Sequence, residues 1–270
     1  MTRVRWSVPY RVDLRSVGAD AFDRLVELGA LDAEFLHGSI AAVMPDAIAP
    51  KDIGRALGIN DVSVSPVQPR DGGSVWVLRP HPIRIGRLRI VPADEGAEPD
   101  TLRLIDAEAF GTGLHPTTAL CIEAVQDTLQ IVVPHALLDV GTGSGVLALG
   151  ALTMGVPRAL GIDIDDDALR VAAENARINA LDDRLQLAHG GPETVTGVWP
   201  LVLANVLAAP LIEMASSLVR RVGHHGQLVL SGMPAAVERD VEEAYRHLGM
   251  QRLRVTSRAG WIALVMQASW

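Results

Sequence analysis

The sequence contains very little cysteine, lysine or aromatic side chain. Its 270 residues include one cysteine, Cys121, and one lysine, Lys51, while aromatic residues make up 4%. A single cysteine excludes a disulfide framework and a thiolate metal cluster, and it fits a reducing cytosol. Arginine supplies the other basic side chains, so we attribute the shortage of lysine to genome bias. No metal site is predicted.

Long apolar runs and basic clusters are also absent. The most apolar stretch, 146–162, is interrupted by Pro157 and Arg158, so no membrane span is predicted. The first fourteen residues, MTRVRWSVPYRVDL, lack the apolar core of a signal peptide. The net charge of −8 argues against a protein that binds nucleic acid by neutralising phosphates. We therefore expect a cytoplasmic protein that contacts neither membrane nor nucleic acid directly.

Residues 1–68 predict a small α+β domain. The pieces are a strand over 4–14, a helix between Ser16 and Gly29, a hairpin bent at 37–39, a helix over 51–58 and a strand over 61–67. This β-α-β-β-α-β order is the ferredoxin-like plan. Residues 69–104, rich in proline, glycine and arginine, contain one hairpin-like piece, and we expect them to form a linker.

Residues 105–270 predict a Rossmann-like α/β domain. From residue 120 onward strands and helices alternate strictly, as in a parallel sheet covered on both faces. The predicted parallel strands are 135–141, 158–165, 184–190, 200–207 and 226–232. The last two strands, 250–258 and 261–267, form a hairpin that adds one antiparallel strand. Seven-stranded methyltransferases have such a hairpin, so the pattern favours S-adenosylmethionine as cofactor.

A glycine-rich turn follows the first parallel strand. Gly141, Gly143 and Gly145 have the spacing G-x-G-x-G, and Val146 stands where a dinucleotide fingerprint needs its third glycine. Taken alone, the turn is also consistent with a purely structural role, in which glycine lets a helix pack closely on the sheet. However, Asp163 ends the second strand, where a carboxylate can accept both hydroxyls of a ribose. Together these residues favour a cofactor site and argue against NAD.

Two further stretches precede helices. AFGTGLHPTTALC (109–121) predicts a helix that begins at Pro116, and ANVLAAPL (204–211) places Asn205 where it could cap the next helix. With LLDVGTGSGVLALGAL, GIDIDDDAL, AENARIN and GWIALVMQ, these stretches resemble the ribosomal protein L11 methyltransferases (PrmA). The resemblance covers residues 105–266 in order. It implies a class I methyltransferase fold preceded by a ferredoxin-like substrate-recognition domain.

The resemblance also implies roles for individual residues. The expected cofactor-binding residues are Phe110, Gly111, Thr112, Thr118, Asp139, Gly141, Thr142, Gly143, Gly145, Asp163, Ile164 and Asn205. Asn205 would orient an acceptor amine, and His115 would help take up its proton. A histidine beside proline at a helix start is also a common structural element, so both roles stay open for His115. The implied substrate is an amine of ribosomal protein L11, and we expect a monomer.

Some positions depart from the family pattern. Thr142 stands where the family usually has cysteine, and Trp199-Pro200 replaces an acidic residue before the fourth strand. These departures leave the methyl acceptor open. One alternative is a methyltransferase of the same fold that acts on another protein or a small molecule, and another is a non-enzymatic relative that binds the cofactor. We expect Trp261 to serve in packing.

Overall fold

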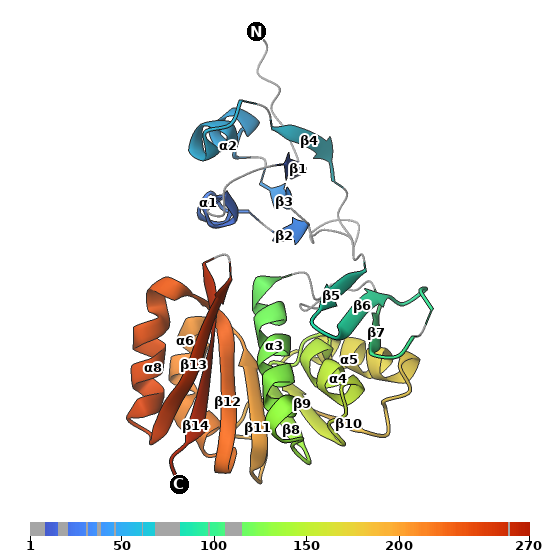
Figure 1. Cartoon of the computed structure of the whole chain (residues 1–270), viewed down its shortest axis with the longest axis vertical. Coiled ribbons are helices and arrows are strands. Elements are labelled where there is room, and N and C mark those ends of the chain that lie inside the picture. Colours follow the sequence, from blue (N-terminus) through green and yellow to red (C-terminus); the bar gives the residue numbers. More distant parts are fainter. Residues whose placement is uncertain are drawn as a thin grey trace. The chain divides into compact units, whose positions relative to one another are not determined.

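The structure is a computed structural model that describes residues 9–15, 21–30, 32–36, 39–45, 47–60, 62–67, 82–96, 98–105, 115–258 and 260–270. The chain divides into two compact units, Met1–Arg79 and Pro80–Trp270 (Figure 1). Each unit has its own sheet and is described by itself. Within the described ranges, no helix is long and apolar enough to cross a membrane.

The first unit is a four-stranded antiparallel sheet with two helices. Its elements are β1 (Tyr10–Arg15), α1 (Ala21–Glu27), β2 (Asp32–Leu36), β3 (Ser39–Met44), α2 (Pro50–Leu57) and β4 (Ser63–Pro66). The strand order β2-β3-β1-β4 is that of a ferredoxin-like domain, which confirms the predicted plan. Alternate side chains of β1 (Tyr10, Val12 and Leu14) are buried, as expected for a strand with one covered face.

A small sheet opens the second unit where a linker was expected. It consists of β5 (Ile83–Ile85), β6 (Leu88–Pro92) and β7 (Thr101–Leu104), in that order. Side chains on all three strands, among them Leu88 and Leu102, lie in the same apolar core as the following helices. The described part of 69–104 therefore belongs to the larger unit, because its apolar side chains are buried there.

The main sheet of the second unit has seven strands. They are β8 (Leu137–Val140), β9 (Ala159–Asp163), β10 (Leu185–His189), β11 (Trp199–Asn205), β12 (Val222–Pro234), β13 (Met250–Arg258) and β14 (Trp261–Ala268). The order is β10-β9-β8-β11-β12-β14-β13, and β14 runs antiparallel to both of its neighbours. This arrangement confirms the predicted Rossmann-like fold with its antiparallel hairpin.

Helices cover both faces of the main sheet. They are α3 (Pro116–Ile131), α4 (Val146–Thr153), α5 (Asp166–Ile178), α6 (Ala208–Glu213), α7 (Ala215–Val219) and α8 (Glu238–Arg246), with the 3-10 turn η1 (Ala235–Val237). Residues of α3, α4 and α5 pack in one core, and those of α6, α7 and α8 pack in the other. At Met214 the segment 208–219 is divided into two short helices, α6 and α7.

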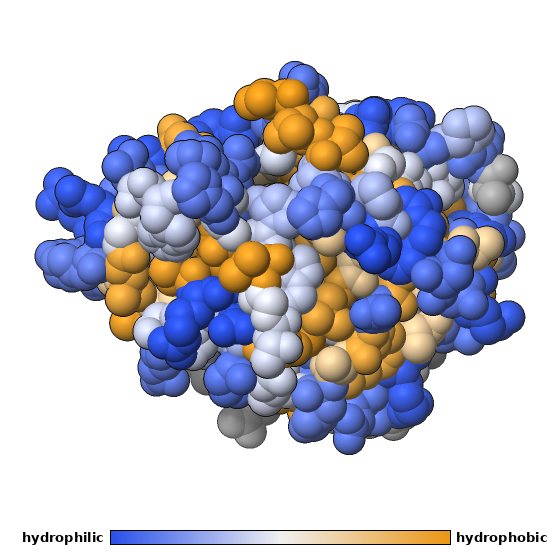
Figure 2. Space-filling view, turned by 90° about the horizontal axis from the view of Figure 1, so that it is seen from below, coloured by the Kyte–Doolittle hydropathy of each residue, from blue (hydrophilic) through white to orange (hydrophobic). Residues whose placement is uncertain are grey.

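The parallel strands of the main sheet begin at one end of the second unit and finish at the other. At the end where α3 finishes, Ile131, Val132 and Val133 are exposed, and Figure 2 shows apolar areas there interspersed with hydrophilic ones. The parallel strands begin at this end, because β8 follows α3 directly. Their carboxyl ends, where ligands of open α/β sheets bind, therefore lie at the opposite end.

Candidate active site

A cavity of about 580 Å³ lies at the carboxyl ends of the parallel strands. Four loops of the second unit form it: the glycine turn after β8, the end of β9, residues 190–192 after β10, and residues 205–207 after β11. Most of its lining side chains are apolar, among them Val140, Val146 and Leu147. The volume lies within the range of about 300–1,000 Å³ that is typical of small-molecule sites.

The glycine turn brings bare backbone to the cavity. Gly141, Gly143 and Gly145 have φ angles of +70°, +55° and +79°, which side-chain-bearing residues rarely adopt. A Cβ atom on Gly141 would lie 2.6 Å from Cγ1 of Val206. The turn therefore needs glycine both for its conformation and for close approach. It leads into α4, whose positive N-terminal end faces the cavity.

The buried carboxylate of Asp139 stabilises the glycine turn through hydrogen bonds. Asp139 has no exposed surface, and one of its oxygens accepts hydrogen bonds from the Thr142 hydroxyl (2.8 Å) and the Ala148 N–H (3.2 Å). Its other oxygen has no partner among the described residues. Burial raises the pKa of Asp139 from 3.8 to about 6, although both hydrogen bonds oppose this shift. Asp139 thus supports the turn and does not line the cavity.

Asp163 connects the end of β9 with the glycine turn. Its carboxylate accepts hydrogen bonds from the N–H groups of Gly143 (2.9 Å) and Asp165 (3.1 Å). The next side chain, Ile164, is 77% exposed and offers the cavity an apolar surface. Asp163 is therefore fixed in orientation, and each carboxylate oxygen retains a further lone pair for a ligand hydroxyl.

His115 caps α3 at the edge of the cavity. Its Nδ1 accepts a hydrogen bond from the Thr117 N–H (3.3 Å) and lies 2.8 Å from the Thr117 hydroxyl. Its ring contacts that of Trp261 edge to face, with centroids 4.8 Å apart. Burial lowers the pKa of His115 from 6.5 to about 4, so the ring is neutral at neutral pH. Trp261 packs as expected, but it also lines the cavity.

Asn205 stands at the end of β11, beside Ser231 of β12. The residue lines the cavity, and its Oδ1 is buried without a hydrogen-bond partner among the described residues. A buried acceptor of this kind costs free energy unless a ligand or water donates to it. Asn205 is therefore suited to receive an N–H or O–H group of a bound molecule.

The structure brings together half of the predicted cofactor-binding residues. Gly141, Thr142, Gly143, Asp163, Ile164 and Asn205 line the cavity, and so does His115. Thr118, Asp139 and Gly145 are not among its lining residues, while Phe110, Gly111 and Thr112 lie outside the described residues. In the part of the chain that the structure describes, no three His, Cys, Asp or Glu side chains are placed to hold a metal.

Several lining residues were not anticipated from the sequence. These are Thr117, Val140, Val146, Leu147, Asp165, Ala168, Gly190, Gly191, Pro192, Val206, Leu207, Pro210, Met214 and Gly232. Residues 190–192 could have been found by the argument that identified Asp163, because they follow the next parallel strand. Met214 and Gly232 carry no comparable signal, since their place depends on the break between α6 and α7 and on the path of β12.

The strand order, the glycine turn after β8 and the cavity at the strand ends define a class I methyltransferase fold. Residues 35–269 match the family described as ribosomal protein L11 methyltransferase (PrmA), and the chain belongs to this family. It is 38% identical over 217 residues to the ribosomal protein L11 methyltransferase of Pelobacter propionicus, covering 77% of this chain and 70% of the relative.

Two further relatives agree with this assignment. The ribosomal protein L11 methyltransferase of Chromohalobacter salexigens is 39% identical over 208 residues, covering 75% of this chain and 68% of the relative. The crystal structure of ribosomal protein L11 methylase from Lactobacillus delbrueckii subsp. bulgaricus superimposes with a TM-score of 0.65 at 30% identity. That match covers 70% of this chain and all of the other. The chain is thus a methyltransferase.

Proposed function

We propose that this methyltransferase uses S-adenosylmethionine to methylate an amine of ribosomal protein L11, either a lysine side chain or the N-terminal α-amine. The observation that carries the proposal is the meeting of Gly141, Asp163 and Asn205 in one cavity. They lie at the carboxyl ends of three neighbouring strands, β8, β9 and β11, in a chain of the L11 methyltransferase family. Membership of the family supports the choice of substrate.

The residues of the cavity fit S-adenosylmethionine. Asp163 can accept hydrogen bonds from both ribose hydroxyls, and Ile164 offers an apolar surface to the adenine. The glycine turn and the N-terminal end of α4 can hold the carboxylate of the methionine part. When bound, the cofactor supplies a methyl group that its sulfonium has already activated. Thr118, Phe110, Gly111 and Thr112 stay proposed contacts on the basis of the resemblance.

The protein's own task is to present a neutral amine in line with the methyl group. A lysine amine has a pKa near ~10.4 and an α-amine one of ~7.7–8.0, so either must lose its proton before reaction. The apolar lining favours the neutral amine, because desolvation lowers an amine's pKa. Asn205 is proposed to orient the amine through its unpartnered Oδ1. This arrangement would accelerate methyl transfer by holding the amine in line with the methyl group.

We propose that the enzyme is a monomer. We further propose that the protein acts in the cytoplasm, where ribosomal proteins are made and assembled. No part of this proposal requires direct contact with nucleic acid or a membrane.

The proposal is tested by calorimetry and by methyl transfer. The protein should bind S-adenosylhomocysteine and should not bind NAD. With tritiated-methyl S-adenosylmethionine it should label purified ribosomal protein L11 among a set of ribosomal proteins, and mass spectrometry should locate the methyl groups on amines. Binding without labelling of L11 would favour another acceptor. Binding of NAD and not of S-adenosylhomocysteine would refute the cofactor assignment.

A further inference from the structure

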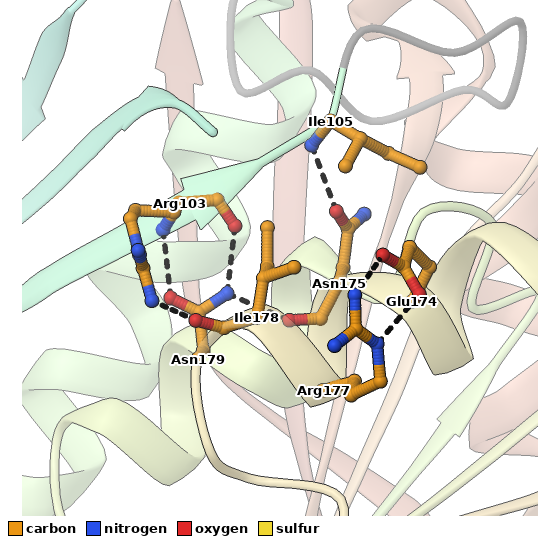
Figure 3. Close-up of polar contacts among 7 residues, drawn as sticks. All are labelled: Arg103, Ile105, Glu174, Asn175, Arg177, Ile178 and Asn179. Carbon is orange, nitrogen blue, oxygen red and sulfur yellow. Dashed lines mark hydrogen bonds and ion pairs between the residues drawn. The ribbon is translucent and has the colours of Figure 1, made fainter. Parts of the chain in front are cut away.

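The inner face of α5 carries Asn175, and Asn179 is the C-cap residue of the same helix; the proposed function gives neither a role. Asn175 and Asn179 both belong to the stretch AENARIN, and they lie one helical turn apart. Figure 3 shows both side chains directed toward β7 and the residue that follows it. Asn175 has no exposed surface, so the hydrogen bonds of its amide are shielded from water.

Asn175 connects two segments that are far apart in the sequence. Its Oδ1 accepts a hydrogen bond from the Ile105 N–H (2.8 Å), and its Nδ2 donates one to the Ser144 carbonyl (2.8 Å). Ser144 belongs to the glycine turn that borders the cavity. Ile105 follows β7 and directly precedes residues 106–114 in the sequence. One side chain therefore fixes the glycine turn relative to the end of β7.

Asn179 makes a different set of contacts. It accepts a hydrogen bond from the Arg103 N–H (2.9 Å) and donates to the carbonyls of Arg103 (2.7 Å) and Asn175 (2.7 Å). The Arg103 guanidinium also donates to the Ile178 carbonyl at the end of α5. These contacts hold β7 against α5, and none of those named reaches the glycine turn.

The helix that carries Asn175 packs directly under the glycine turn. Gly145, which precedes α4, approaches α5 so closely that a Cβ atom on it would lie 3.2 Å from Cβ of Ala172. Ala172 is one turn before Asn175 on the same face of α5. The turn therefore rests on this helix by van der Waals contact at Ala172 and by a hydrogen bond at Asn175.

We propose that Asn175 is a positioning residue of the active site, which sets the glycine turn for cofactor binding by bridging Ser144 and Ile105. Its amide is specific for this task, because one end must donate to a carbonyl and the other must accept from an N–H. A buried group that loses such a partner is left unsatisfied, and the turn must shift to find another. The inference rests on the proposed function only in that S-adenosylhomocysteine is the ligand that reports on the turn.

The test compares Asn175→Ala with Asn179→Ala. Both variants remove side-chain hydrogen bonds between α5 and the segment Arg103–Ile105, so both should lower the melting temperature. Only Asn175→Ala should weaken S-adenosylhomocysteine binding, with at least a tenfold rise in Kd by calorimetry. It should raise KM for S-adenosylmethionine in the same proportion, while kcat changes less than threefold. Asn179→Ala should keep the wild-type Kd within twofold.

A second measurement needs no ligand. In Asn175→Ala, hydrogen exchange should accelerate at the Ile105 amide and at the Gly145 amide of the turn. In Asn179→Ala it should accelerate at Arg103 and leave Gly145 unchanged. Should Asn175→Ala not fold, Asn175→Ser serves in its place, because a serine hydroxyl is too short to bridge both partners.

The inference is overturned if the Asn175 variant is destabilised but keeps the wild-type Kd, because the residue would then be merely structural. An equal loss of affinity in Asn179→Ala would also overturn it, since loosening of β7 would then explain both results. Failure of the wild-type protein to bind S-adenosylhomocysteine at all would instead contradict the proposed function.

Discussion

The hydroxyl of Thr142 donates a hydrogen bond to the carboxylate of Asp139, with 2.8 Å between the two oxygens, directly beneath the glycine turn. The same carboxylate oxygen accepts the Ala148 N–H of α4. Asp139 thereby ties the turn to the first turns of the helix. Because it is fully buried, its pKa rises to about 6, and the strength of this tie depends on pH.

We expect Asp139→Asn to change how stability depends on pH. The folded protein binds the Asp139 proton more tightly, with a pKa of about 6, than the unfolded chain does, with a pKa of 3.8. The stabilisation from this proton is therefore complete below pH 3.8 and is lost as the pH rises through about 6. Between pH 4 and 7, wild type should lose roughly 2 kcal/mol relative to the variant. Urea unfolding at several pH values measures this difference.

The matched variant is Thr142→Val, which has nearly the same shape and removes only the hydroxyl. It should cost about 1–3 kcal/mol of unfolding free energy, because the buried carboxylate loses one of its two donors. The pKa of Asp139 should rise further, since the Thr142 bond lowers it. A stability difference between wild type and Asp139→Asn that does not vary with pH would contradict this account.

His115 is expected to act as the cap of α3. Asparagine is a good N-cap, so His115→Asn should keep kcat within about fivefold of wild type and be more stable than His115→Ala by about 1 kcal/mol. If His115 instead accepts the proton of the amine, both variants should lose about 10²-fold or more in kcat. Steady-state methyl transfer to ribosomal protein L11 distinguishes these outcomes.

The buried ring of His115 should also make the protein sensitive to acid. Its pKa is about 4 in the folded state and 6.5 in the unfolded chain, so the folded state favours the neutral ring. The stabilisation is complete above pH 6.5 and is lost as the pH falls toward 4. From pH 7 to pH 5, wild type should lose at most about 2 kcal/mol relative to His115→Asn.

Gly141→Ala should weaken cofactor binding strongly. Alanine would strain the turn at φ +70° and place its Cβ against Val206, so we expect at least a tenfold rise in Kd for S-adenosylhomocysteine. Gly155→Ala is the control, because Gly155 also has a positive φ but has nothing within 4 Å of the added Cβ and does not line the cavity. This control should lose stability and keep its affinity.

Alanine variants of Asp163 and Asn205 should differ in effect, one on cofactor affinity and the other on kcat. Asp163→Ala removes the proposed acceptors of the ribose hydroxyls, which would hold the ribose equally in ground and transition states, so Kd should rise about 10- to 100-fold. Asn205→Ala should instead lower kcat about 10- to 100-fold with a small change in Kd, because the proposed role of Asn205 is to orient the arriving amine. If both variants change only Kd, the proposed role of Asn205 is wrong.

Most of the main sheet could be predicted from the sequence because its strands are short apolar runs bounded by clear turns. Parallel strands end at a common edge, and this rule selects Asp163, whereas the role of Asn205 was implied by the family resemblance. The rule does not distinguish residues at that edge by the direction of their side chains. Asp139 precedes the turn and points beneath it, so proximity in sequence does not make it a lining residue.

The hairpin predicted within 69–104 is present as β5 and β6, but its packing could not be predicted, for a physical reason. Ile83, Ile85, Leu88 and Ile90 alternate with arginines, which predicts a hairpin, but a hairpin alone does not reveal which surface will cover it. In the structure these strands are covered by the core that contains α3 and α4. The described proline and glycine residues of this stretch lie in the turns of the small sheet or at the ends of its strands. A linker has the same composition, so composition alone could not distinguish the two.

The burial of β5, β6 and β7 in the core of the second unit determines where the chain can be truncated to test the role of the first unit. We predict that the unit Met1–Arg79 selects the substrate and takes no part in the methyl chemistry, because every lining residue of the cavity lies beyond residue 80. Its ferredoxin-like sheet offers an edge to which another small protein domain can dock. A truncated variant should begin at Pro80, since a cut within β5 or β6 would remove buried core.

The variant that begins at Pro80 should bind S-adenosylhomocysteine with a Kd within about threefold of the full chain. It should methylate ribosomal protein L11 at least 100-fold more slowly, because the docking surface is gone while the cavity is intact. The full chain, with its net charge of −8, should also lose activity on a basic substrate as salt increases. An unchanged rate in the truncated variant would show that the acceptor is recognised at the cavity alone, and a small-molecule acceptor would then be the better hypothesis.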